Sequence, residues 1–225
     1  MFTSQWGGSA GERPSAEQLE QWRSRMTPPE HEFPAGVGLT VLLGRSDDAA
    51  VGLTHVEVFS TGFRFTLAVR VRQPRPQLVR GGLHMLISSR IHPGVDVPLE
   101  DRLLLGIEYP DGRRASTLTD PRTHRPGAPA DPDQLVLVQQ GAGGGERSVD
   151  QSYWVAPLPP EGLVTVVVAW PGFGIQESRT TLDGAVIRAA AAHSQPLWPP
   201  QPVSEPAERP APPRPSSGWF AEPPS

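Results

Sequence analysis

The chain has 225 residues, a formal net charge of −4 and 20 basic side chains, all of them arginines, so it carries no net positive field to attract nucleic acid. It contains no cysteine, which excludes disulfides, thiolate nucleophiles and cysteine-based zinc sites. There is no signal-peptide pattern at the N-terminus and no apolar stretch approaching the ~20 residues of a membrane-spanning helix. We therefore expect no membrane span and a cytoplasmic location.

Proline, glycine and polar residues divide the sequence into three parts. Residues 1–33 are polar and turn-rich, which predicts a flexible N-terminal arm. Residues 34–198 carry the apolar periodicity and are expected to form one domain around a single core. From Gln195 onward there are 11 prolines and no periodic apolar run, so residues 199–225 are predicted to be a disordered, proline-rich tail.

The N-terminal arm contains one helix signal, at residues 14–26. Ser15 and Gln18 have the spacing of a capping box, and Leu19 and Trp22 lie three residues apart on one helical face. So few apolar residues cannot hold a helix in water by themselves. The helix either docks on the domain, the alternative we favour, or forms only with a partner.

The first half of the domain is predicted to be strands. Apolar runs at 37–44 and 51–60 are followed by 63–72, in which apolar residues alternate strictly with polar ones, so that one face is buried and the other is wet. The segment 74–102 is ambiguous. Its apolar stretch at 83–88 is compatible with a strand or with a helical turn.

The second half continues with a hairpin, four further strands and a helix. Leu103–Tyr109 and Arg113–Leu118 flank the turn residues Pro110, Asp111 and Gly112. The further strands are predicted at 134–140, 148–158, 162–170 and 175–182, of which 162–170 is apolar on both faces and therefore central. Asp183 is predicted to cap a short helix over 184–194, with Leu182 and Ile187 at hydrophobic-staple spacing.

These patterns predict the fold class. Many short strands with few helices favour an all-β, two-layer antiparallel β-sandwich, immunoglobulin-like or jelly-roll-like, with a short C-terminal helix and disordered tails.

The glycine-rich segment Gly141–Ser148 has the length of a phosphate-binding loop. That motif needs glycine at the position of Glu146 and lysine at the position of Arg147, and a helix should begin there. The residues that follow favour a strand, so we predict a hairpin connection. We expect no cofactor.

His55 and Glu57 share one face of a predicted strand. Such a pair could bind a metal or act as acid and base, although a polar surface pair is the favoured alternative. Two acidic clusters, at Asp96, Glu100 and Asp101 and at Asp131 and Asp133, lack the spacing of a calcium-binding loop. We assign no catalytic residue and no metal site.

Arginines mark the best-defined surface of the predicted domain. Arg64, Arg70 and Arg72 share the wet face of the strand at 63–72, and Arg113 and Arg114 of the hairpin could lie near them. This face could bind an acidic partner, although it lacks the aromatic residues on which nucleic-acid bases stack. The alternative is a solvated face on which the arginines pair with acidic neighbours.

The C-terminal tail offers a second candidate surface. Trp219 and Phe220 are large apolar residues in a segment with no core of its own, and the prolines around them favour a polyproline II conformation. The pair could form a linear docking peptide, or be incidental to a low-complexity end. Trp198 is expected to pack back on the domain.

The segment 153–191 resembles an actinobacterial protein family without an established activity. The shared features are the run Y-W-V-x-P-L-P-P, a strand that ends in tryptophan, the motif G-I-x-E-S-R and an alanine-rich closing helix. The resemblance implies a bacterial, cytoplasmic protein and no catalytic residue.

We therefore expect a non-enzymatic module that binds a protein partner, with nucleic acid an unfavoured partner. Two rival functions remain open, namely a hydrolase whose site is built from loops and a structural subunit of a homo-oligomer.

Overall fold

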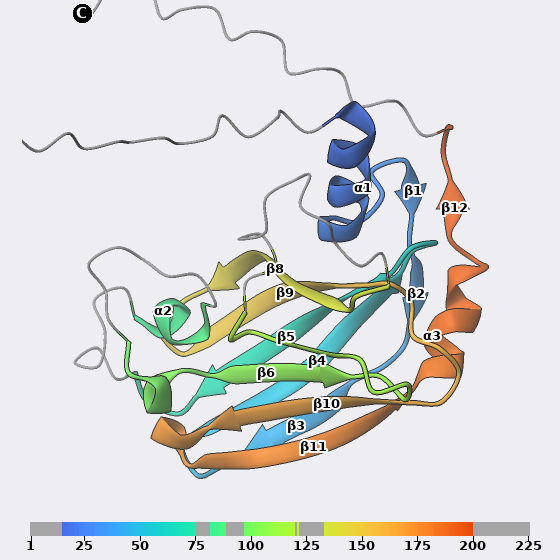
Figure 1. Cartoon of the computed structure of the whole chain (residues 1–225). Coiled ribbons are helices and arrows are strands. Elements are labelled where there is room, and N and C mark those ends of the chain that lie inside the picture. Colours follow the sequence, from blue (N-terminus) through green and yellow to red (C-terminus); the bar gives the residue numbers. More distant parts are fainter. Residues whose placement is uncertain (1–14, 75–81, 89–96, 120, 122–132, 200–225) are drawn as a thin grey trace, which may run out of the picture.

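The computed structural model describes residues 15–74, 82–88, 97–119, 121 and 133–199. Their strands form two main antiparallel sheets that pack face to face (Figure 1). This confirms the predicted all-β sandwich.

The larger sheet has six strands in the order β2-β4-β5-β9-β8, and β3 also pairs with β4. Its strands are β2 (Ala35–Val37), β3 (Val41–Arg45), β4 (Ala49–Val58), β5 (Phe63–Val71), β8 (Val136–Gly144) and β9 (Ser148–Ala156).

The smaller sheet has four strands in the order β11-β10-β6-β7, so β10 is central as predicted. Its strands are β6 (Leu104–Glu108), β7 (Arg114–Ser116), β10 (Leu163–Trp170) and β11 (Ile175–Asp183). A separate ribbon joins β1 (Glu32–Phe33) to β12 (Gln195–Pro196).

The helices are short and lie at the margins of the sandwich. They are α1 (Ala16–Met26), α2 (Leu83–Ile87) and α3 (Gly184–Ala191), with single 3₁₀ turns η1 (Leu99–Asp101) and η3 (Pro171–Phe173). The segment 83–88 therefore adopts the helical turn of its two predicted alternatives. At the start of α3 the Asp183 carboxylate accepts a hydrogen bond of 2.8 Å from the Ala185 amide, which confirms the predicted cap.

The core lies between the sheets and follows the alternation in the sequence. Phe63, Phe65, Leu67 and Val69 of β5 are each at most 1% exposed. The residues between them point to the opposite face of the larger sheet, because successive side chains of a strand alternate. This opposite face, which is turned away from the smaller sheet, is called the outer face below.

Helix α1 docks on part of the outer face. The Trp154 indole N–H of β9 donates to the Arg25 carbonyl at 3.0 Å, and the Gln140 amide of β8 donates to the Met26 carbonyl at 3.1 Å. Met26 is buried among Val136, Val138 and Trp154. Docking, the favoured alternative for this helix, is therefore what the structure shows.

The prediction of one strand over 37–44 is wrong. Two strands, β2 and β3, pair in succession with β4, and the chain leaves the ladder between Val37 and Val41. The interruption lies opposite a bulge in β4 at His55, where the pairing with β5 shifts between Thr54 and Glu57. A bulge puts an extra residue into one strand, so the neighbouring strand cannot stay in register.

The glycine-rich segment connects two strands, as predicted. β8 runs on through Gly141–Gly144, and Gly145–Arg147 link it to β9. No helix begins here, so the arrangement that a phosphate-binding loop needs is absent from this connection.

Candidate interaction face

Part of the outer face of the larger sheet is left uncovered by α1. It consists of small side chains on the three central strands β4, β5 and β9, all partly exposed. We call these residues the outer strip: Ala50, Gly52, Thr54, Thr66, Ala68 and Ser152.

The members of the strip lie side by side across the sheet. Gly52 of β4 lies opposite Ala68 of β5, and Thr54 lies opposite Thr66, which in turn faces Ser152 of β9. At the margin next to Gly52, Leu42 of β3 is 59% exposed. A partner could therefore approach the sheet closely and meet an apolar side chain at its edge.

An ion pair closes the end of the strip next to α1. Arg64 donates from Nε and Nη2 to Oε2 of Glu57, at 2.7 and 2.6 Å, across the β4–β5 ladder. The guanidinium carbon also lies 5.7 Å from the centre of the Phe59 ring. Both charged side chains are 36% exposed, so a partner could still reach them.

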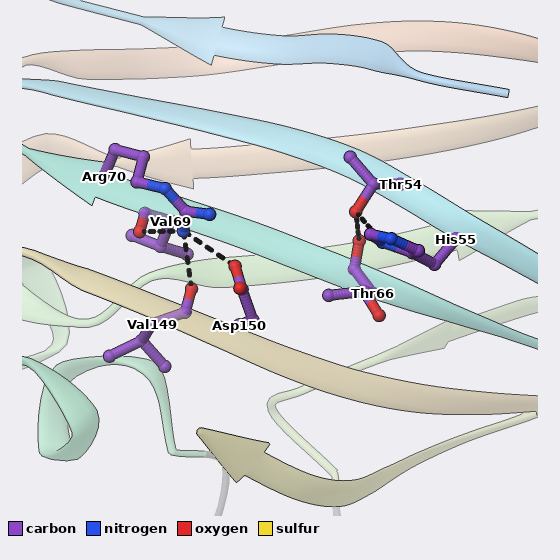
Figure 2. Close-up of polar contacts among 7 residues, drawn as sticks. All are labelled: Thr54, His55, Thr66, Val69, Arg70, Val149 and Asp150. Carbon is purple, nitrogen blue, oxygen red and sulfur yellow. Dashed lines mark hydrogen bonds and ion pairs between the residues drawn. The ribbon is translucent and has the colours of Figure 1, made fainter. Parts of the chain in front are cut away.

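A second ion pair stands at the other end of the strip (Figure 2). Arg70 donates from Nη1 to Oδ1 of Asp150 at 2.7 Å and to the Val69 carbonyl at 2.9 Å. The two charged side chains are 51% and 53% exposed. Both arginines therefore pair with acidic neighbours, which was the alternative to an unpaired arginine face.

His55 borders the strip and has an unusual backbone. Its φ of 51° lies in the left-handed region, which histidine adopts more readily than most residues but at some cost in strain. Its Nδ1 lies 2.9 Å from Oγ1 of Thr54, and that hydroxyl donates to the Thr66 carbonyl at 3.5 Å (Figure 2). Because that hydroxyl gives its hydrogen to the Thr66 carbonyl, Nδ1 is the donor toward Oγ1.

At the bulge in β4, the side chains of His55 and Glu57 make contacts with different residues. His55 contacts Thr54, whereas the carboxylate of Glu57 bonds to Arg64. Among the residues that the structure describes, no three histidine, aspartate or glutamate side chains lie close enough together to hold a metal ion.

The suggestion that Arg113 and Arg114 lie near the other arginines is wrong. Arg114 is on β7 of the smaller sheet, and Arg113 immediately precedes it. Sequence distance could not show that the hairpin β6–β7 belongs to the opposite layer.

Each of these two arginines has an acidic partner of its own. Arg114 pairs with Glu108 at 2.7 Å. Arg113 pairs with Asp111 at 2.6 Å and donates to the Asp133 carbonyl at 2.7 Å. The hydrogen bond from Arg113 holds the pKa of the Asp111 carboxyl below its usual value.

The other predicted site residues are at separate places. Arg72 follows β5, where its side chain is exposed and its amide donates to the Asp48 carbonyl at 2.7 Å. Glu100 and Asp101 lie in η1. Trp219 and Phe220, like Asp96 and Asp131 of the acidic clusters, are outside the described residues.

Sequence reasoning missed two residues of this face, Asp150 and Leu42. Both come from strands that neighbour β4 or β5 in space, and pairing between strands is not visible in a single sequence. The alternation in 63–72 could nevertheless place Thr66 and Ala68 on the wet face.

Comparisons with protein-family models, with curated proteins and with solved structures found no match. Among the described helices, none has the length and apolar character required to cross a bilayer.

Proposed function

We propose that this protein is a non-catalytic binding module that recognises a protein partner through the outer strip. The observation that carries the proposal is the division of the outer face. One part is buried under α1, whereas the strip in the centre of the same sheet is covered by no described element. A sheet face with small side chains leaves a partner's helix or strand room to stack beside α1.

Charge supports a protein partner rather than nucleic acid. Arg64 and Arg70 are each neutralised by a carboxylate, so the strip carries two ion pairs and no excess of positive charge. Exposed ion pairs of this kind contribute about 0–1 kcal/mol to stability. They can therefore exchange partners with charges on another protein at little cost and fix its orientation.

The cytoplasmic location and the docking role of Trp219 and Phe220 remain proposals that rest on the sequence. The absence of cysteine supports the location. Aromatic residues anchor many interfaces, which supports a role for the tail pair.

A bulky charge in the strip tests the proposal. The variant Ala68→Arg places a long side chain at the centre of the strip. The matched control Thr165→Arg places the same side chain at a half-exposed position of β10 in the smaller sheet. We expect Ala68→Arg to reduce the recovery of partner proteins by affinity capture at least about tenfold, the effect of losing ~1.4 kcal/mol of binding energy. The control should leave recovery unchanged.

A charge swap separates recognition from folding. The double variant Arg70→Asp with Asp150→Arg keeps an ion pair but reverses its direction. It should leave the thermal midpoint nearly unchanged, because the pair is exposed, and should weaken capture. Equal capture by the wild type, Ala68→Arg and the swapped protein would reject the strip as the binding surface.

A further inference from the structure

A different surface, the end of β8, is an open edge of the larger sheet. Among the described strands, none pairs with the side of β8 that faces away from β9. Gly141–Gly144 at this end are all exposed. At the opposite margin, by contrast, β3 is closed against β11, because the Ser178 hydroxyl donates to the Leu43 carbonyl.

The hydrogen bonds of the ladder show which groups of β8 point outward. The Gly145 amide donates to the Ser148 carbonyl at 2.7 Å, so these two residues form a hydrogen-bonded pair of the ladder. Along an antiparallel ladder, hydrogen-bonded pairs alternate with pairs whose N–H and C=O groups point away from the partner strand. Gly144, opposite Val149, and Ala142, opposite Gln151, therefore direct their N–H and C=O groups away from β9.

The register of β8 against β9 shifts between Gln139 and Ala142, and the carbonyl groups at this bulge are hydrogen-bonded within the fold. The buried Gln151 amide donates to the Gln140 and Gly141 carbonyls, at 3.3 and 3.0 Å. The groups left facing outward thus begin at Ala142.

At two positions of this edge, neither packing nor backbone torsion within the fold requires glycine. A Cβ added at Gly141 or Gly143 would meet nothing within 4 Å, and neither residue has a positive φ. Glycine inside a strand costs about 0.5–1 kcal/mol relative to alanine. Glycines in such positions are found where another backbone approaches closely.

The chain itself contains a segment suited to that edge. An added strand must donate backbone N–H groups, which proline lacks. Beyond the last described residue, Pro199, the prolines leave one proline-free stretch of seven residues, Ser216–Glu222, and no other longer than three. This stretch contains Trp219 and Phe220.

The linker of residues 200–215 is long enough for Ser216–Glu222 to reach β8 within one molecule. In Figure 1 the arrowhead of β8 lies on the left of the sandwich and β12, from which the chain leaves, lies on the right. A domain of this size has a radius of gyration of about 15 Å. Residues 200–215 can span about 50 Å when extended, which exceeds the diameter of the domain.

We propose that Ser216–Glu222 adds as a further strand to the open edge of β8 in the same molecule. Its backbone bonds to the outward groups of Ala142 and Gly144. Adjacent residues of a strand point to opposite faces, so Trp219 and Phe220 lie on the two faces of the extended sheet. The tail then covers an edge that would otherwise pair with other chains.

Hydrogen exchange of the Ala142 and Gly144 amides tests this proposal in the full-length chain. The variant Gly218→Pro interrupts the proline-free stretch, and the matched control Ala207→Pro adds a proline elsewhere in the tail. Both substitutions lie outside the sandwich, so neither should change its folding. We expect Gly218→Pro to speed exchange of the two amides about tenfold or more, and Ala207→Pro to leave it as in the wild type, at every protein concentration.

Three results would overturn the proposal. Exchange at the same rate in all three proteins means that the tail does not protect the edge. Equal acceleration by both prolines means that Ser216–Glu222 is not the segment that docks. Protection that is lost on dilution means that the added strand comes from a second copy of the chain. None of these outcomes bears on the outer strip, because that surface is tested by partner capture.

Discussion

At the scale of single residues, Gly62 shows how closely the turn between β4 and β5 approaches the neighbouring strand. A Cβ at this position would lie 2.3 Å from the Val155 carbonyl oxygen and 2.7 Å from Cζ2 of Trp154. The Gly62 carbonyl also accepts a hydrogen bond of 2.8 Å from the Phe59 amide, which holds the turn in place. Space, and not backbone torsion, requires glycine here.

We therefore predict that Gly62→Ala lowers the free energy of unfolding by about 2 kcal/mol or more, because backbone and a buried ring must both move. Gly38→Ala is the control, since its added methyl group meets nothing within 4 Å. The control should change stability by less than about 0.5 kcal/mol. Urea denaturation of the two variants measures both values, and equal losses would contradict the packing argument.

Arg64 and Arg70 show that carboxylates on neighbouring strands can neutralise the charge of a strand. Sequence alternation correctly placed Arg64 and Arg70 on the wet face of one strand. It could not show that Glu57 and Asp150 neutralise them, because those carboxylates come from neighbouring strands. A row of basic residues in a sequence is therefore compatible with a surface of little net charge.

At the scale of elements, α1 shows how a short helix with few apolar residues is stabilised by docking. Its last turn is held by the indole of Trp154 and by Gln140, and the Arg25 side chain donates to the Gln134 carbonyl at 2.9 Å. Isolated helices of this length are marginal in water. The helix exists because the outer face gives Met26 and Trp22 a surface to cover.

Truncating the buried anchor should release this helix. We predict that Met26→Ala destabilises the protein by about 2 kcal/mol, at the low end for a buried methionine because the site is peripheral. Arg23→Ala, an exposed change on the same helix, should have little effect. Denaturant midpoints report the loss of stability, and hydrogen exchange of the α1 amides shows whether the helix opens first. An unchanged midpoint and unchanged exchange would mean that Met26 does not hold the helix.

At the scale of the whole molecule, two buried tyrosines link stability to pH. Burial raises the pKa of Tyr109, which follows β6, and the pKa of Tyr153 in β9, both well above the usual value for tyrosine. The Tyr109 hydroxyl donates to the Pro157 carbonyl at 2.6 Å. Both phenols must stay neutral in the folded protein.

The direction of the pH dependence follows from those shifts. A tyrosine in the unfolded chain ionises with a pKa of about 10, so above that pH ionisation stabilises the unfolded state. We predict a free energy of unfolding that begins to fall near pH 10 and continues to fall as pH rises toward the raised pKa values of the folded protein, with no contribution from these groups below about pH 9.

Urea denaturation across this pH range measures the decline. The variant Tyr109→Phe should lose about 1 kcal/mol near neutral pH with its hydrogen bond, and its stability should then decline less steeply with pH. A decline as steep as that of the wild type would show that Tyr109 does not contribute to it.

Periodicity by itself determined much of this fold. The alternation in 63–72 fixed which residues of β5 are buried, the apolar run at 162–170 gave a central strand, and Asp183 marked the start of α3. These predictions hold because burial of one face, strand geometry and helix capping act between residues that are close in the sequence.

Tertiary structure alone decided how the elements meet. It put Arg114 on the opposite sheet from Arg64, bent β4 at His55 so that Glu57 pairs with Arg64, and left the outer strip uncovered beside α1. These features depend on contacts between strands far apart in the chain. Strand pairing is made by backbone groups that every residue carries, so side-chain patterns specify that a strand forms but not which strand lies next to it.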